Sequence, residues 1–211
     1  MNTKKSLLSR FGQDRLFWLI VGALLVAFLL LQRRTASLGF VFSLVALLMA
    51  ITIHEFAHAW AANRLGDPTA RLAGRLTLNP LAHLDPLGTV MMVITVLTGM
   101  GIGWGKPVPV SPWRLKYGSR LGNGLVALAG PLSNLALAAL AAFLLRVILP
   151  WAPVTGILLG QTLVLTNVVI AFFNLLPIPP LDGASVLIGL LSLSRGRWAW
   201  QLTQFFGQLA A

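Results

Sequence analysis

Two histidines four residues apart, with a glutamate directly after the first, are the residues of this chain best suited to chemistry. They are His54, Glu55 and His58 in the sequence HEFAH. On a helix, residues four positions apart share one face, so the two imidazoles can bind one metal ion. A glutamate beside them can take a proton from the attacking water. The pattern predicts a zinc site with Glu55 as the general base.

The composition favours this site over an ordinary pair of core histidines. The chain has 3 His, two of which are in the motif, and Glu55 is its only Glu. Ionisable side chains in an apolar segment are costly, so such a cluster is a functional-site hypothesis by default. We therefore expect one zinc ion per chain.

The sequence around the motif is apolar enough for a membrane protein. Of 211 residues, 57% are hydrophobic and 10% are charged, and the mean hydropathy is +0.83. Several apolar runs reach the roughly 20 residues that cross a bilayer. These features exclude a soluble domain. They predict an all-α polytopic membrane protein with about five to six membrane segments, forming a single integral domain over residues 1–211.

Four apolar runs are long enough to be spans, at 16–32, 38–63, 121–149 and 154–176. The first is expected to be an extra N-terminal transmembrane helix rather than a cleaved signal peptide, because it is long and is followed at once by Arg33 and Arg34. The positive-inside rule places the N-terminus in the cytoplasm and HEFAH in the inner half of the cell (inner or plasma) membrane.

The polar stretch 64–86 is the longest between the spans. Within it, 71–78 partly alternates polar and apolar residues, which predicts a half-buried strand of a short cytoplasmic β-hairpin. Such a strand could receive an extended substrate by edge pairing. For His83 and Asp85 we favour local hydrogen bonds within turns, with a direct role in the site as the alternative.

The net charge of +11 is carried by Lys and Arg residues between the apolar runs. Nucleic acid is a possible partner for such a charge. We instead expect basic loops held against anionic lipid at the cytoplasmic face, and no nucleic-acid partner. The chain has no Cys, which excludes thiolate zinc ligands.

A catalytic zinc takes three protein ligands and leaves a fourth position for water. Among the other acids, Asp182 alone lies in an apolar segment broken by three prolines, which is tolerated at membrane depth only where the backbone lines a cavity or is buried. Asp182 is therefore the predicted third ligand. The alternatives are that Asp182 caps a helix over 184–193, or that His83 is the ligand.

This choice of ligand fixes the relative direction of the helices. His54 and His58 lie near the C-terminal end of the run 38–63, and Asp182 follows the run 154–176. For Asp182 to reach the histidines at one depth in the membrane, these two runs must cross it in the same direction. Of the two intervening segments only 121–149 should cross fully, so 87–103 is predicted to be re-entrant or shallow. Positive-inside counting agrees, with 11 Lys and Arg inside against three outside, Arg33, Arg34 and Arg146.

Three motifs together resemble the site-2 protease family of intramembrane zinc metalloproteases. They are HEFAH, GPLSN at 130–134 and NLLPIPPLDG at 174–183. NPLAHLDPLG at 79–88 and GKPVPV at 105–110 are similar to the compact bacterial branch, without PDZ or CBS domains. The resemblance covers about 38–190.

The resemblance implies that His54, His58 and Asp182 are the zinc ligands, that Glu55 is the general base and that Asn174 steadies the oxyanion. It also implies membrane-spanning protein substrates, cut within or near their transmembrane helices in regulated intramembrane proteolysis. Family members tend to carry a further span after the LDG motif, but 195–211 is too short and polar. Either the chain ends early or a homo-oligomer covers that side.

Two other classes of protein remain as alternatives. Intramembrane His, Glu and Asp can form a relay in a transporter or channel, and broken helices mark transport sites. Against this class, the chain shows no internal repeat and has a single Glu. The other alternative is a membrane scaffold without activity, which the complete set of ligands and base argues against.

Overall fold

The computed structural model describes residues 22, 34–98 and 103–193. The expected N-terminal helix 16–32, apart from residue 22, and the tail 195–211 therefore lie outside the described residues. Within the described part, the protein is all-helical, in agreement with the predicted fold class.

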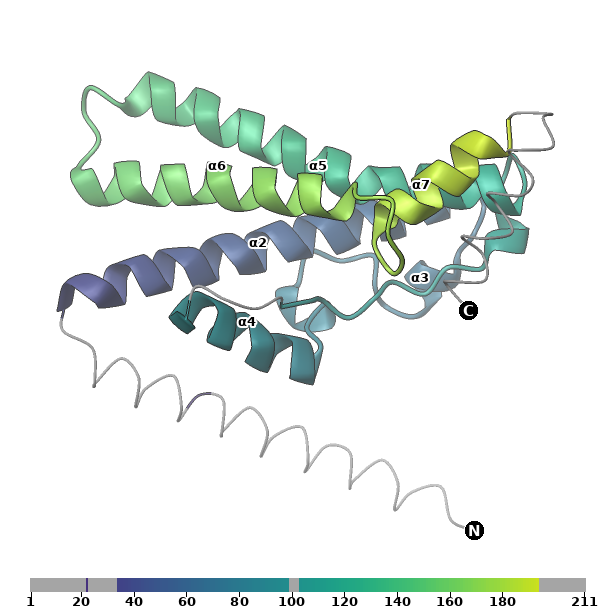
Figure 1. The fold of residues 1–211 in the computed structure, drawn as a ribbon, viewed down its shortest axis with the longest axis horizontal. Helices are drawn as coiled ribbons and strands as arrows, with labels where there is room; N and C mark the ends of the chain where they lie inside the picture. Colours follow the sequence, from purple (N-terminus) through teal and green to yellow (C-terminus); the bar gives the residue numbers. More distant parts are fainter. Residues whose placement is uncertain (1–21, 23–33, 99–102, 194–211) are drawn as a thin grey trace, which may run out of the picture.

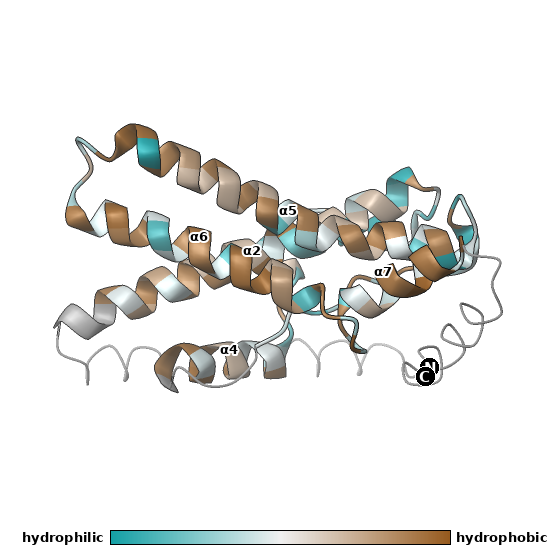
Figure 2. Ribbon diagram, turned by 45° about the horizontal axis from the view of Figure 1, so that its top comes forward, coloured by the Kyte–Doolittle hydropathy of each residue, from teal (hydrophilic) through white to brown (hydrophobic). Residues whose placement is uncertain are grey.

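Three long helices form the frame: α2 (Arg34–Arg64), α5 (Ser119–Ile148) and α6 (Val154–Asn174). All three are long and apolar enough to cross a membrane, and they match the predicted runs closely. Figure 1 shows that α2 and α6 run in the same direction, with α5 opposite to both, as predicted. The ribbons of α5 and α6 are mostly brown in Figure 2, which marks hydrophobic residues.

Shorter helices connect and complete this frame. They are α3 (Thr69–Leu72), η1 (Pro80–Ala82), α4 (Pro86–Thr98), η2 (Pro112–Arg114) and α7 (Asp182–Leu191). In Figure 1, α4 lies along α2, and α7 follows α6 on the side of α5.

The expected five to six membrane segments are not supported by the described residues, which contain three candidate spans. One expected span, 16–32, lies almost wholly outside the described residues, and the rest of the difference comes from the short apolar helices. Helix α4 has 13 residues and α7 has 10. At 1.5 Å per residue these helices are about 20 Å and 15 Å long, less than the roughly 30 Å of a bilayer core.

The predicted cytoplasmic β-hairpin with a strand at 71–78 is wrong. The chain forms α3 at Thr69–Leu72 and then turns at Gly74, which has φ +70°. No strand occurs among the described residues, and their isolated β-bridge joins Leu84 to Gly105. The partial alternation at 71–78 does not mark a buried apolar face, because Leu72 and Leu78 are exposed whereas the polar Arg75 is buried and bonds to a different loop.

The end of α2 is a Schellman motif that turns the chain sharply after the span. The N–H of Gly66 donates to the carbonyl of Asn63, and the N–H of Asp67 donates to that of Ala62. Gly66 has φ +102°, a conformation that favours glycine. The turn brings Asp67 under η2, where its carboxylate accepts the N–H of Ser111 at 2.6 Å.

The two ends of the α4 segment lie side by side. Leu84 and Gly105 pair in an antiparallel bridge, and the N–H of Lys106 donates to the carbonyl of His83 at 2.8 Å. Gly103 packs on Met92 so closely that a Cβ there would lie 2.2 Å from the Met92 Cγ. The segment between Leu84 and Gly105, which includes α4, therefore begins and ends at the same place in the structure.

Small residues let the helices pack closely around α5. Five alanines of α2 are buried. On α5, Gly124 faces Gly189 of α7, where a Cβ on either would lie 3.0 Å from the other's Cα. Small residues at helix interfaces allow close backbone approach, which is how helices associate where the hydrophobic effect is weak. This close packing brings α7, and with it Asp182, against the motif on α2.

Candidate metal centre

The two histidines of HEFAH lie on the buried face of α2. His54 and His58 are both buried, and their rings meet edge to face with centroids 4.5 Å apart. Spacing of four residues on one helix accounts for this stacking. Each ring therefore presents its Nε2 towards the interior of the bundle.

Asp182 reaches the same point from the first residue of α7. Its Oδ2 lies 3.0 Å from Nε2 of His54 and 3.2 Å from Nε2 of His58. The three residues can offer ligand atoms that all lie within 4.8 Å of one another. Atoms bound to one tetrahedral zinc at about 2.0–2.2 Å lie about 3.4 Å apart, so this spacing fits zinc.

The helix-capping alternative for Asp182 does not describe this arrangement. Helix α7 begins at Asp182 itself, its N-cap residue is Leu181, and no side-chain bond caps it. Gly183 explains how the turn places the carboxylate, because a Cβ there would lie 2.2 Å from the carbonyl oxygen of Leu175. Only glycine allows α7 to start directly against the end of α6.

Hydrogen bonds on the far side of each imidazole fix which nitrogen faces the centre. Nδ1 of His54 lies 2.6 Å from Oδ1 of Asn134, and Nδ1 of His58 lies 2.8 Å from the carbonyl of Val126. The Asn134 amide is oriented by its Nδ2, which donates to the carbonyl of Ala50 and to Oδ1 of Asn167. Both Nδ1 atoms therefore donate, which leaves a lone pair on each Nε2.

This donor set fits a cation. Two lone pairs face a carboxylate oxygen, Oδ2 of Asp182, which is buried and has no hydrogen-bond donor. Lone pairs and a carboxylate repel one another unless a positive charge lies between them. Two imidazoles and one carboxylate also match the ligand set of catalytic zinc sites, which leave one position open.

Gly130 of the GPLSN motif completes the pocket for the imidazoles. A Cβ at this position would lie 2.5 Å from Nε2 of His58 and 2.7 Å from Cε1 of His54. From the sequence, Gly130 stands out only as the first residue of GPLSN, with no sign that it lies near the histidines. Its proximity to the rings depends on how α5 packs on α2, which no local pattern reveals.

Glu55 follows His54 on α2, and its carboxylate lies against the loop that follows α4. Its Oε2 is buried without a hydrogen-bond partner. The backbone at Gly105 is so close that a Cβ there would lie 3.3 Å from Oε1 of Glu55 and 2.7 Å from Cγ2 of Ile51. Oε2 of Glu55 is thus free to accept a hydrogen bond or a proton, as a proton acceptor requires.

Asn174, the predicted oxyanion donor, lies at the end of α6. It is half-buried, and its Nδ2 donates to the carbonyl of Ile170, one turn earlier in its own helix, at 3.0 Å. Asn174 makes no hydrogen bond with His54, His58 or Asp182.

His83 and Asp85 make the local hydrogen bonds that were favoured for them. Nε2 of His83 lies 2.7 Å from the carbonyl of Thr77. Oδ1 of Asp85 accepts the N–H of Gly88 at 2.8 Å, which caps the start of α4. His83 therefore organises its loop and does not join the group around Asp182.

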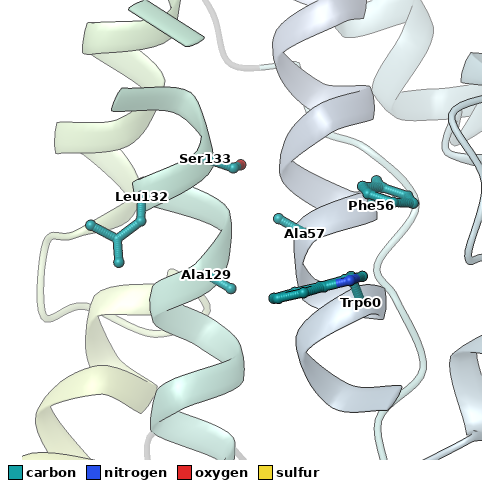
Figure 3. A pocket seen from close by; sticks show the side chains of 6 residues that line it. All are labelled: Phe56, Ala57, Trp60, Ala129, Leu132 and Ser133. Carbon is teal, nitrogen blue, oxygen red and sulfur yellow. The ribbon is translucent and has the colours of Figure 1, made fainter. Parts of the chain in front are cut away.

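An apolar cavity of about 400 Å³ flanks the centre between α2 and α5. Figure 3 shows Ala57 and Trp60 of α2 facing Ala129 and Ser133 of α5 across it. Its lining residues on α2 are Phe56, Ala57 and Trp60, which lie at other positions around the helix than His54, Glu55 and His58. The cavity therefore lies on a different side of α2 from Glu55.

Apolar spans around a buried group of two imidazoles and a carboxylate, with a free glutamate beside it, have the arrangement of a membrane-embedded metalloprotease. Comparisons with known proteins agree. The family model described as Peptidase family M50 matches residues 154–206.

Three relatives are similar over most of this chain. The Bacillus subtilis protein named "Putative zinc metalloprotease YwhC" is 41% identical over 150 residues, which are 68% of this chain and 66% of the relative. Rip2 of Mycolicibacterium smegmatis, described in the same words, is 35% identical over 70% of this chain and 56% of its own length. MJ0611 of Methanocaldococcus jannaschii, also so described, is 30% identical over 84% of this chain and 85% of its own. No solved structure matches.

The chain belongs to peptidase family M50, the site-2 protease family of zinc metalloproteases. The chain spans less than two thirds of the length of the first two relatives, and its described residues include three helices long and apolar enough to cross a membrane.

Proposed function

We propose that this protein is an intramembrane zinc metalloprotease that hydrolyses peptide bonds within or near the transmembrane helices of membrane-anchored substrates. One observation carries the proposal. His54 and His58 from a span and Asp182 from a distant helix converge on one buried point beside Glu55. Nothing in the packing of three apolar spans requires such a cluster, and its desolvation is costly unless a metal occupies it.

His54, His58 and Asp182 would hold one zinc ion per chain through Nε2, Nε2 and a carboxylate oxygen. A zinc ion there supplies Lewis acidity, which polarises a scissile carbonyl and makes water a better nucleophile. The chain's own part is to fix the imidazoles, through Asn134 and the Val126 carbonyl, and to exclude bulk water by burial.

Glu55 would act as the general base and then as the general acid. Its unpartnered carboxylate oxygen accepts a proton from the attacking water and returns it to the leaving amine, so no covalent acyl-enzyme forms. Asn174 would donate its amide to the developing oxyanion. Because its Nδ2 donates to Ile170, this role requires the side chain to exchange that bond for one to substrate.

The proposed topology places the N-terminus and the loops at 64–84 and 103–118 on the cytoplasmic face of the cell membrane, with 87–103 re-entrant. The pairing of Leu84 with Gly105 supports this placement, because a segment whose ends adjoin enters and leaves on one side. All of residues 1–211 then form one integral domain.

The proposed partners are membrane-spanning protein substrates and anionic lipid. Exposed basic and aromatic side chains gather on the loops proposed as cytoplasmic, as expected where a protein meets anionic headgroups. They are Arg71, Trp113, Arg114, Lys116 and Tyr117. We further propose that a second copy of the chain covers the side of α7, and we assign no nucleic-acid partner.

Zinc content and cleavage, measured on one set of variants, test the function. Purified wild-type protein should carry about one zinc and cut a single-span model substrate in vesicles, with products identified by mass spectrometry. Glu55→Gln should keep zinc and lose cleavage by a factor of about 10²–10⁴, the usual contribution of a general base. Asp182→Asn should lose both zinc and cleavage, whereas the matched change Asp85→Asn should lose neither.

Unchanged cleavage in Glu55→Gln would overturn the protease assignment. Zinc retained by Asp182→Asn would move the third ligand elsewhere. Zinc transported across the vesicle without cleavage would favour the transporter class.

A further inference from the structure

Arg75 is a buried cation that the proposed chemistry does not use. It lies in the loop after α3 with 6% of its surface exposed, although arginine is rarely this buried without a purpose. Its backbone N–H donates to the carbonyl of Ala70 at 2.8 Å, which fixes the start of the side chain. The guanidinium therefore points inward from a firmly held position.

The guanidinium holds the loop that covers Glu55. Its Nη2 donates to the carbonyl oxygens of Lys106 and Pro107. On its other side the same loop is held by the N–H of Lys106, which donates to the carbonyl of His83. Residues 105–107 are thus fixed from two directions.

Glu55 lies directly beneath this loop. The backbone at Gly105 leaves no room for a side chain, since a Cβ would lie 3.3 Å from Oε1 of Glu55 and 2.7 Å from Cγ2 of Ile51. Burial lowers the pKa of Arg75, and the negative charge of Glu55 partly offsets this by raising it, so the two charged groups act on each other. Nε of Arg75 is buried and has no hydrogen-bond partner.

We propose that Arg75 is a positioning residue for catalysis: by holding the carbonyls of Lys106 and Pro107, it fixes the Gly105 backbone as the wall that orients the Glu55 carboxylate. The inference rests on the proposed function of Glu55 as the general base. It assigns Arg75 no contact with zinc or substrate. A displaced wall leaves zinc bound but misplaces the base, and a misplacement of about 1 Å costs up to about 10²-fold in rate.

Four variants test this role in zinc-loaded protein reconstituted in vesicles. Arg75→Met removes the donors, Arg75→Gln keeps a neutral donor, and Gly105→Ala pushes the wall directly. Gly39→Ala is the matched control for the glycine change, because a Cβ there meets nothing within 4 Å. The measurements are zinc per chain, kcat and KM for one model substrate, and thermal stability.

The expected result is full zinc content in all four variants and a kcat at least about tenfold lower in Arg75→Met and Gly105→Ala, with little change in KM. Arg75→Gln should have a kcat between those of Arg75→Met and wild type. The reason is that hydrogen bonds to the Lys106 and Pro107 carbonyls, rather than charge, hold the Gly105 backbone in place. Gly39→Ala should match wild type.

Three outcomes would overturn the inference: a kcat within twofold of wild type in Arg75→Met, equal losses in Arg75→Gln and Arg75→Met, or a loss confined to KM or to zinc content. A wild-type protein that binds zinc but cuts no substrate would instead refute the proposed function. Amide exchange at Lys106 then still tests the structural part, since it should be faster in Arg75→Met than in wild type, and equal rates would refute the hold of Arg75 on this loop.

Discussion

Oδ1 of Asn134 lies 2.6 Å from Nδ1 of His54 and thereby links the middle of α5 to the first histidine of HEFAH. The same amide donates from Nδ2 to Ala50 and to Asn167, so its orientation is fixed at both ends. A hydrogen bond of this kind sets the tautomer and angle of a metal-ligating imidazole.

Asn134→Ala should weaken zinc binding by about 10–100-fold, the usual effect of removing such a partner. Zinc affinity measured by competition with a chelating dye checks this. Asn123→Ala, on the same helix but without a recorded bond to the histidines, should bind zinc like wild type. Equal affinity in Asn134→Ala and wild type would show that His54 needs no partner on Nδ1.

Gly130→Ala should disrupt the centre through volume alone. The added methyl group would lie 2.5 Å from the His58 ring, so the imidazoles or α5 must move. We expect loss of most zinc from purified protein, measured by elemental analysis. Gly156→Ala, whose Cβ would meet its nearest atom at 3.6 Å, should keep full zinc content. A zinc-loaded Gly130→Ala variant would contradict the close approach of α5.

Removal of zinc should destabilise the folded protein. A ligand that binds only the folded state stabilises it by about 2.7 kcal/mol at a free concentration of 100 times its Kd. A strong chelator should therefore lower the thermal midpoint of wild type in detergent. Asp182→Asn should show no such shift, and a shift of equal size in that variant would place the stabilising metal at another site.

Asp67 should make stability depend on pH on the acid side. Burial raises the pKa of this carboxyl, but hydrogen bonds from Ser111 and Thr69 outweigh it and hold the pKa below its usual value of about 3.9. The unfolded chain then binds more protons, so this stability is present above the unfolded pKa and is lost as pH falls through the lower, folded pKa.

Asp67→Asn should therefore lose about 1–3 kcal/mol of stability at neutral pH, as expected for buried hydrogen bonds to a charged group. Its unfolding should also depend less on pH below about 5. Thermal midpoints across pH 2–8 in detergent, with Asp14→Asn as the control, measure both effects. A variant whose acid limb parallels that of wild type would rule out Asp67 as the titrating group.

The two ends of α5 should face opposite sides of the membrane. Trp113 precedes this helix and is 79% exposed, and Trp151 follows it and is 81% exposed. Because the chain has no Cys, Trp113→Cys and Trp151→Cys give clean single-label variants. An impermeant maleimide on intact cells should label position 151 and spare position 113 until the cells are opened. The reverse pattern would invert the proposed topology.

Features that depend on local spacing and hydrophobicity were predictable from the sequence. The i, i+4 spacing places His54 and His58 on one face of any helix, and the long apolar runs predict the three spans. The choice of Asp182 followed from its cost in an apolar segment. The requirement that it meet the histidines then predicted that α2 and α6 run in parallel.

The tertiary structure alone decided which groups surround these residues. Asn134, Val126 and Gly130 contact the imidazoles because of how α5 packs on α2, and this packing leaves no local pattern in the sequence. Arg75 shows the limit most clearly. Partial alternation around it predicted a strand, whereas its side chain is buried to bind the carbonyls of a distant loop. The alternation predicted burial of the apolar residues, whereas the folded chain exposes Leu72 and Leu78 and buries Arg75, because the carbonyls that Arg75 binds are brought to it by tertiary packing.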